Sequence, residues 1–232
     1  MKMKRREFLK LLSTATTGLI MSGCASIDAF DVDKRLNRKI SYRNHESELD
    51  VASIPEEKRE EISTIIVSEM KKYPQNIILN NLNRAYVYSR LFINGMDVQG
   101  LRKESNIYLS MKNDELPLVF HHEFSSILFD NYRRFFEKKE WNESNIKGFR
   151  YSEPLTKGMV AIGNKKASTI LEPKLFSSGF LNQYSTTSID NDFSEYSAHL
   201  MCYEDMITIL SNKYPRMKNK IKMVKEFYKK IE

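Results

Sequence analysis

The sequence contains little cysteine, little histidine and no long apolar run. Only two cysteines, Cys24 and Cys202, occur among 232 residues, so at most one disulfide can form within the chain. There are four histidines, and two of them are adjacent. The weakly apolar stretch at residues 9–21 is too short and too rich in serine and threonine to cross a bilayer stably.

The positive charge of the chain is unevenly distributed. The formal net charge is +7, but the first ten residues carry five basic groups and one acidic group, which leaves about +3 for the rest. We therefore do not interpret the charge as a nucleic-acid-binding signal. Hydrophobic residues make up 41% of the chain and charged residues 29%, a composition typical of a globular domain with a core of its own.

The N-terminus has the order of parts found in a secretion signal, with a basic region followed by an apolar run and a Gly-Cys pair. Residues 4–10, KRREFLK, resemble the twin-arginine export motif, with Lys4 where serine or threonine is usual. Residues 20–24, IMSGC, resemble a bacterial lipobox, with Met21 in the usual leucine place. The resemblance implies cleavage before Cys24 and attachment of lipid to its sulfur. The alternative is an N-terminal membrane anchor that keeps its signal.

These features predict three segments: a signal peptide at 1–23, a lipidated N-terminus and tether at 24–52, and a domain at 53–232. The mature protein would be lipid-anchored in a bacterial cell envelope, in the periplasm or facing the outer membrane. A lipid on Cys24 would exclude a disulfide with Cys202. Cys202 itself lies in an apolar helical run and is interpreted as a small core residue.

The domain is predicted to have an α+β fold. A capping-box pattern at 53–56 opens a helix that runs to about Tyr73, before Pro74. Strand-forming residues then dominate the segment 77–110, with a turn at Asn94-Gly95 and a short strand at 106–110. The change from helical to alternating pattern predicts a small sheet before and beside the next helix.

That next helix, at about 116–129, carries the adjacent histidines His121 and His122, followed by Glu123. Its apolar residues recur near helical spacing, Asp114 can cap its start, and Pro117 is tolerated in a first turn. His122 and Glu123 are therefore predicted to lie in mid-helix among apolar neighbours. A charge is costly there unless it has a partner.

The run His122-Glu123-Phe-Ser-Ser126 resembles the H-E-x-x-H helix of zinc metallopeptidases, in which two histidines bind one metal and the glutamate acts as general base. Ser126 stands where the second histidine would be. A hydroxyl is a poor zinc ligand beside imidazole, thiolate or carboxylate. The alternative from these residues alone is a buried histidine pair that is hydrogen-bonded within a core helix.

The residues that follow carry a more specific resemblance, which lies in their order and spacing rather than in one motif. In order, they are Trp141, the Gly148-Phe149 pair, Tyr151, the Gly179-Phe180 pair, Tyr184 and the run N-D-F-S-E at 191–195. They resemble the zinc-binding metallopeptidase lipoproteins related to the catalytic domain of anthrax lethal factor. The similarity covers roughly residue 53 to the C-terminus. It implies a zincin-like fold, in which a small sheet packs on an active-site helix with further helices at the C-terminus.

The resemblance implies a role for each matching residue. His122 falls on the first metal ligand and Glu123 on the general base. Tyr184 falls on the tyrosine that donates a hydrogen bond to the oxyanion of the tetrahedral intermediate. Asn191 falls on a glutamate ligand, and Glu195 on the acid that orients the first histidine. The base, the tyrosine and the orienting acid are thus kept. Two of the three metal ligands, at Ser126 and Asn191, are replaced.

A rearranged ligand set is an alternative. Glu195 and His199 are four residues apart and share one helix face, so with His122 they could form a two-histidine, one-carboxylate zinc set. Asp192 offers a further oxygen nearby. Otherwise Glu195 accepts a hydrogen bond from His122, and His199 is a packing or surface residue.

Three interpretations remain open. The first is an active zinc peptidase with a rearranged ligand set. The second is a pseudo-enzyme that keeps the peptidase fold as a peptide-binding module and needs no cofactor. The third is a structural envelope lipoprotein. The replaced ligands favour the second. The expected partners are a peptide or protein and, through Cys24, a membrane, with no nucleic acid.

Overall fold

The computed structural model describes residues 29–43, 49–111, 115–151 and 168–232. The signal segment, the lipobox with Cys24 and the capping residue Asp114 lie outside these ranges. The described strands form two sheets, and the first has the order β1-β3-β7-β6. Their bounds are β1 (Ile40–Ser41), β3 (Arg84–Tyr88), β7 (Asn106–Ser110) and β6 (Gly100–Lys103). β1 and β7 run parallel to β3, whereas β6 pairs antiparallel with β7.

The second sheet is an antiparallel sheet of three short strands in the order β2-β4-β5. The strands are β2 (Asp50–Ala52), β4 (Arg90–Ile93) and β5 (Met96–Val98). The Asn94-Gly95 turn between β4 and β5 has φ values of 50° and 75°, the left-handed region that asparagine and glycine tolerate best. The predicted turn and the predicted strand at 106–110 are both confirmed.

Helices follow and interrupt the strands along the chain. Their bounds are α2 (Ala29–Asn37), α3 (Arg59–Met70), α4 (Gln75–Asn81), α5 (Leu116–Asn131), α6 (Lys138–Glu143), α8 (Pro173–Phe176), α9 (Ile189–Cys202), α10 (Glu204–Lys213) and α11 (Pro215–Ile231). Short 3-10 helices occur at η1 (Glu56–Lys58), η3 (Arg133–Phe135) and η4 (Tyr184–Thr186). The α+β class is therefore confirmed.

The helix predicted from the capping box begins later than expected. Residues 56–58 form the 3-10 helix η1, α3 starts only at Arg59, and neither start has a side-chain cap. Pro55 has an extended conformation, with ψ of 142°. A proline also disfavours helical geometry in the residue before it, so Ser53 cannot act as the cap of this helix.

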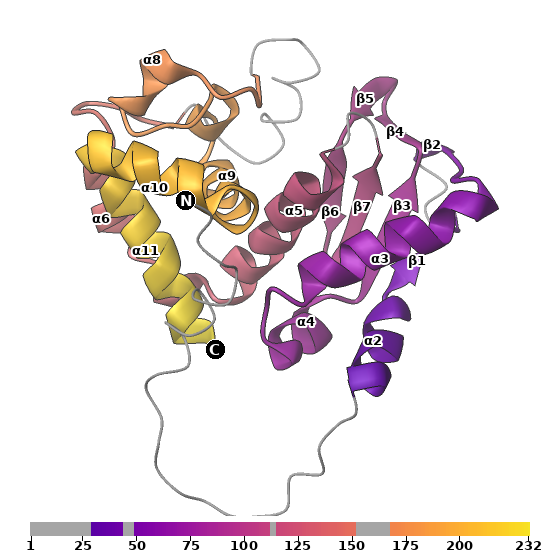
Figure 1. Cartoon of the computed structure of the whole chain (residues 1–232). Helices are drawn as coiled ribbons and strands as arrows, with labels where there is room; N and C mark the ends of the chain where they lie inside the picture. The colour runs from indigo at the N-terminus through magenta and orange to yellow at the C-terminus, as the bar shows by residue number, and fades with distance from the viewer. Residues whose placement is uncertain (1–28, 44–48, 112–114, 152–167) are drawn as a thin grey trace, which may run out of the picture. The chain divides into compact units, whose positions relative to one another are not determined.

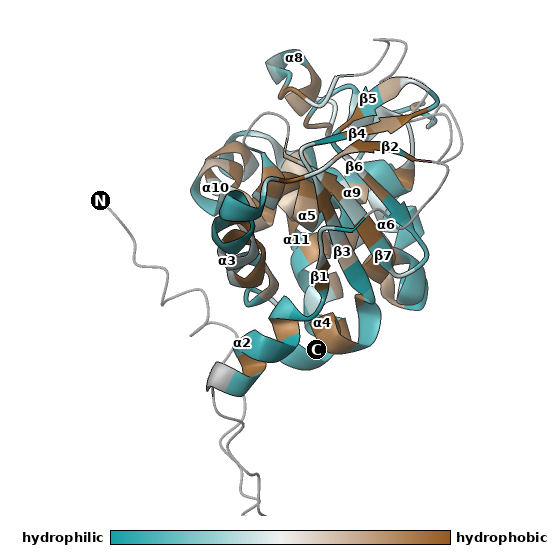
Figure 2. Ribbon diagram, turned by 90° about the vertical axis from the view of Figure 1, so that its right-hand side faces the viewer, coloured by the Kyte–Doolittle hydropathy of each residue, from teal (hydrophilic) through white to brown (hydrophobic). Residues whose placement is uncertain are grey.

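α5 is the element on which the other layers pack. Asp33–Glu232 form one compact unit, and within it α5 contacts β6 and β7 of the first sheet, α3 and, most extensively, α9. Figure 1 shows α9 and α11 (gold and yellow) on one side of α5 and the strands on the other. In Figure 2, α3 lies on the same side of the strands as α5.

Because α5 is enclosed in this way, eleven of its sixteen residues are buried, including His121, His122, Ser125 and Ser126. Its polar side chains must therefore find partners inside the protein. Among the described residues, no helix combines the length and apolar character that a membrane crossing requires.

Candidate functional site

His122 meets Glu195 at the contact between α5 and α9. The imidazole Nδ1 lies 3.0 Å from Glu195 Oε1, and the histidine is 9% exposed. At this distance a protonated His122 forms an ion pair with the Glu195 carboxylate. Burial alone would lower the pKa of His122. The carboxylates of Glu195, Glu123 and Asp190 outweigh burial and raise it above its ordinary value.

Glu195 is held from its other side by Asn182. The Asn182 amide donates to Glu195 Oε2 at 2.6 Å, and the Asn182 oxygen accepts from the backbone N–H and the hydroxyl of Ser185. Burial would raise the pKa of Glu195. His122 first, then His199 and the Asn182 hydrogen bond, lower the pKa below its ordinary value. This carboxylate is therefore kept ionised by its neighbours.

Glu123 lies against the edge strand β6. A Cβ atom added to Gly100 would come within 2.6 Å of both Glu123 Oε1 and Val119 Cγ1, so only a glycine lets strand and helix approach this closely. Burial raises the pKa of Glu123, and His122 and Arg102 oppose the shift. A carboxyl with a raised pKa beside an imidazole is suited to accept a proton.

Tyr184, at the start of η4, completes the group. Its ring centroid is 5.6 Å from that of His122. Burial, followed by the nearby carboxylates of Glu123 and Glu195, raises the pKa of Tyr184 well above its ordinary value. The hydroxyl therefore stays protonated and can act as a hydrogen-bond donor. The structure thus places Glu195 and Tyr184 beside His122 and its neighbour Glu123, the four residues to which the resemblance assigns the general base, the tyrosine, the first histidine and its orienting acid.

The residues at the two replaced ligand positions are engaged in other contacts. Ser126 Oγ donates to Asp190 Oδ1 at 2.8 Å and lies 2.7 Å from Ser194 Oγ. The Asn191 amide donates to Thr187 Oγ1 at 2.8 Å, and its backbone N–H donates to Ser188 Oγ at the start of α9. The sequence did not single out Ser188 as this N-cap, although a serine before an acidic first turn is the usual signal.

The carboxylate that accepts from Ser126, that of Asp190, also has a cationic partner, Arg102 of β6. The guanidinium lies 2.5 Å from Asp130 Oδ2 and 3.1 Å from Asp190 Oδ2. Burial would lower the pKa of Arg102, but Asp190 and Asp130 raise it above its ordinary value. Burial raises the pKa of Asp190, against the effect of Arg102 and Ser126. The sequence did not point to Arg102 or Asp190, because they are far apart in the chain and match no motif.

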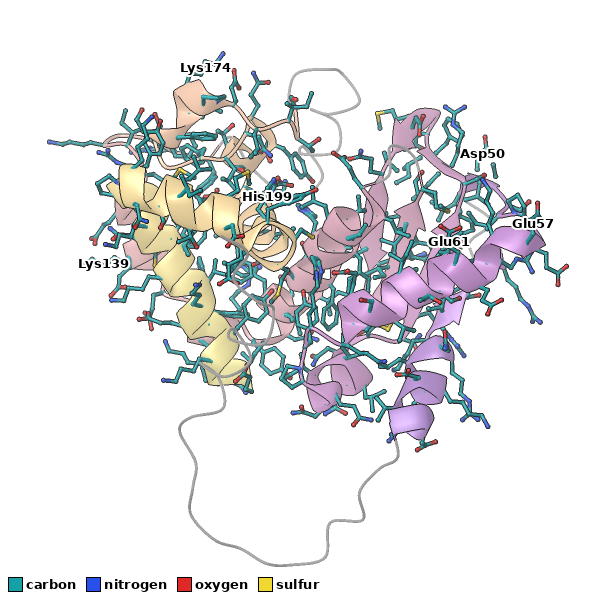
Figure 3. All side chains as sticks on the ribbon, in the orientation of Figure 1. Asp50, Glu57, Glu61, Lys139, Lys174 and His199 are labelled. Carbon is teal, nitrogen blue, oxygen red and sulfur yellow. The ribbon has the colours of Figure 1, made fainter. Side chains whose placement is uncertain are left out.

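In the rearranged ligand set, both histidines lie near Glu195, but among the described residues the ligand atoms of His122, Glu195 and His199 do not all lie within 4.8 Å of one another. His199 Nδ1 donates to the backbone oxygen of Glu195 at 2.9 Å and is 3.8 Å from Glu195 Oε2. Figure 3 shows His199 in the interior, whereas labelled surface residues such as Lys139 project outward. Asp192, the further oxygen ligand considered above, is used elsewhere: its Oδ2 accepts from Lys220 Nζ at 2.5 Å and from the hydroxyl of Tyr151 at 2.6 Å.

The donors at the two positions where the resemblance expects further ligands do not fit a zinc ion. Ser126 and Asn191 offer neutral groups that already have partners, whereas zinc takes imidazole, thiolate or carboxylate ligands. The carboxylate beside His122, that of Glu195, is already hydrogen-bonded to Asn182. In the described part of the chain, one group of three such residues has ligand atoms that all lie within 4.8 Å of one another: Glu69, His121 and Cys202. Cys202, predicted as a core residue, is partly exposed at the end of α9.

Comparison with known proteins adds no further assignment, since no family model, curated protein or solved structure matches this chain.

Proposed function

We propose that this chain is a lipid-anchored envelope protein that has a zincin-like domain and binds extended peptides without hydrolysing them. One observation supports the proposed absence of hydrolysis. The group formed by Ser126, Asp190 and Arg102 lies where the resemblance expects a metal ligand. The Arg102 guanidinium, paired with the buried Asp190 carboxylate, supplies a positive charge at this place in the absence of a metal. Ser126 donates its hydrogen bond to the same carboxylate. Glu123 then has no metal-activated water to deprotonate.

Peptide binding is supported by the position of β6. Among the described strands, β6 (Gly100–Lys103) pairs with β7 alone, so its outer backbone groups can pair with an added strand. An extended peptide that joins a sheet edge gains main-chain hydrogen bonds, and neighbouring pockets select its side chains. Glu123 lies directly against Gly100 of this strand, so a peptide on the edge would pass close to the His122 group.

The experiment is a paired assay of binding and cleavage with full-length protein in detergent. A mixture of unstructured peptides is expected to be retained without turnover, with or without added zinc. Zinc-dependent cleavage that is lost in Glu123→Gln and His199→Ala would overturn the proposal and indicate an active zinc peptidase. Failure to retain any peptide would leave only the structural lipoprotein.

A gain-of-function variant tests the same point in the opposite direction. Ser126→His together with Asn191→Glu restores the two replaced ligands beside the kept base, tyrosine and orienting acid. The double variant is expected to bind zinc, and this binding should require His122. The parent protein is expected to show no zinc binding that requires His122. A double variant that folds but binds no such zinc would show that the resemblance does not extend to the geometry of the site.

Anchoring through Cys24 has its own test. A single acyl chain holds a protein only weakly at a membrane, so stable anchoring requires the diacyl-plus-amide modification that the lipobox implies. Cys24→Ala is expected to leave the protein unprocessed or to release it from the membrane fraction. Unchanged mass and location in that variant would contradict the lipoprotein assignment.

A further inference from the structure

On the other face of α5, His121 lies within a second polar cluster. The histidine has no exposed surface, and both of its ring nitrogens have partners. Nε2 is 2.7 Å from Glu69 Oε2 of α3, and Nδ1 is 2.8 Å from the hydroxyl of Tyr73. Cys202, at the end of α9, completes the cluster. These residues come from three different helices, and none of them takes part in the His122 group.

We propose that Glu69, His121 and Cys202 form a binding site for a zinc-class transition metal that is separate from the His122 group. The potential ligand atoms of the three residues all lie within 4.8 Å of one another. Carboxylate, imidazole and thiolate are the three ligand types that zinc takes from proteins. Three protein ligands leave a fourth position for water, and the partial exposure of Cys202 provides a path of entry.

The site needs only a small expansion to accept an ion. Zinc bonds of about 2.0–2.3 Å at tetrahedral angles place neighbouring ligand atoms about 3.3–3.8 Å apart. The Nε2 to Oε2 distance of 2.7 Å is shorter than that, because the two atoms now contact each other directly. The carboxylate of Glu69 is at the end of a flexible side chain. Rotation of that side chain can open the gap without moving a helix.

Tyr73 holds the imidazole in the orientation that a metal on Nε2 requires. Ligation through Nε2 leaves the proton on Nδ1, which then donates to the Tyr73 oxygen. The Tyr73 hydroxyl can in turn interact with Ser125 and Tyr228, whose own oxygens are 2.8 Å apart. This chain of hydroxyl groups makes Tyr73 a positioning residue for the metal ligand His121.

Lys72 is the group that a metal would replace. Its ammonium contacts the Glu69 carboxylate and donates to the backbone oxygen of Met201 at 3.0 Å. The side chain is 23% exposed, so it can turn towards solvent when another cation takes its place beside Glu69. The buried carboxylate therefore has a cationic partner in either state.

The thiol sets the main cost of binding. Burial raises the pKa of Cys202 to about 12, so the free thiol keeps its proton. On binding, the S–H bond breaks, the sulfur lone pair is donated to the metal, and the proton passes to solvent. The positive charge of the ion offsets the cost of ionising the sulfur.

Cobalt titration is the direct test, because a thiolate bound to Co²⁺ gives a charge-transfer absorption that imidazole and carboxylate do not. The probe is Co²⁺ alone, added to full-length protein that carries Cys24→Ser, so that Cys202 is the one thiol. One equivalent is expected to produce the thiolate band, and Zn²⁺ is expected to displace it. Cys202→Ser should remove the band. Tyr73→Phe should keep it but weaken binding about 10- to 100-fold.

Two control variants separate this site from the peptidase-like group. His122→Gln and His199→Ala are expected to leave the cobalt spectrum and affinity unchanged. His121 is fully buried and Cys202 is partly exposed, so the decision rests on Cys202→Ser, with folding checked by thermal unfolding. A folded parent protein without a thiolate band, or a band that survives Cys202→Ser, would overturn the proposal. Cobalt binding that lacks the band and depends on His122 would instead contradict the absence of metal in the proposed function.

Discussion

Two adjacent histidines on α5 have opposite electrostatic environments. His121 is fully buried beside one carboxylate, Glu69, and one ammonium, Lys72. Burial lowers the pKa of His121, and Glu69 does not fully compensate. For His122, three carboxylates outweigh burial and raise the pKa. Adjacent residues of a helix point in different directions and contact different neighbours. The sequence position of a histidine therefore says little about its protonation.

The same division is repeated one turn later. Ser125 Oγ lies 2.8 Å from the hydroxyl of Tyr228, a neutral partner on the His121 side. Ser126 Oγ donates to the Asp190 carboxylate on the His122 side. The cluster of Glu69, His121 and Cys202 thus lies on one face of α5, and the contact of His122 with Glu195 on the other. Each face is defined by the elements that pack against it.

The largest expected difference between the faces is in stability. His121→Ala removes a fully buried ring and leaves a cavity, so the free energy of unfolding should fall by about 3–5 kcal/mol even though Glu69 keeps Lys72 as a partner. His122→Ala should cost about 1–3 kcal/mol, because Glu195 keeps the Asn182 amide as a donor. Urea unfolding of both metal-free variants measures the two values. Equal losses would contradict the asymmetry.

Gly100→Ala should disturb the His122 face alone. The added Cβ would meet Glu123 Oε1 and Val119 Cγ1 at 2.6 Å, and overpacking of this kind costs about 1–3 kcal/mol. In NMR spectra, the imidazole resonances of His122 are expected to shift and those of His121 to stay in place. Adding Val119→Ala should recover part of the loss by making room. A Gly100→Ala protein as stable as the parent would show that strand and helix can separate freely.

The two serines provide a smaller, matched comparison. Ser126→Ala removes a hydrogen bond to a buried carboxylate, worth about 1.5–3 kcal/mol. Ser125→Ala removes a bond between neutral hydroxyl groups, worth about 0.5–1.5 kcal/mol. Thermal or chemical unfolding of the pair measures both losses under identical conditions. A larger loss for Ser125→Ala would mean that Arg102 alone satisfies Asp190.

The pH dependence of stability should have opposite signs for the two histidines. Because the folded state raises the pKa of His122, its stabilisation is complete below the ordinary value of 6.5 and is lost as pH rises through the folded pKa. Glu195 has a lowered pKa, so its contribution is present above the ordinary value of 4.5 and is lost as pH falls through the folded pKa. The advantage of the parent over His122→Gln should therefore be largest between these two values.

For His121 the sign is reversed, since a lowered pKa means that protonation favours the unfolded state below the ordinary value of 6.5. The parent should lose stability relative to His121→Gln as the solution is acidified. Each unit of pKa shift corresponds to about 1.4 kcal/mol. Unfolding curves of metal-free protein across this pH range measure it. Parallel curves for both variants would contradict the assignment of opposite pKa shifts.

Local sequence patterns determined the elements of this protein that depend on neighbouring residues. Alternation predicted the strand at 106–110, Asn94-Gly95 predicted the turn between β4 and β5, and apolar spacing predicted the buried helix α5. The start of α3 was wrong because the proline at 55 fixed the backbone locally against the capping pattern. The resemblance to a family indicated that His122, Glu123, Tyr184 and Glu195 belong together, which no local pattern could.

Only the tertiary structure decided which charges face one another across α5. Arg102 and Asp190 are 88 residues apart, and Glu69 and His121 are 52 residues apart. Pairs at such separations leave no periodic trace in the sequence, because their contact depends on how β6, α3 and α9 pack around one helix. Because these groups are buried, each pairing has a large effect on stability. Without solvation by water, the free energy and the pKa of a charged group depend on the few groups that contact it.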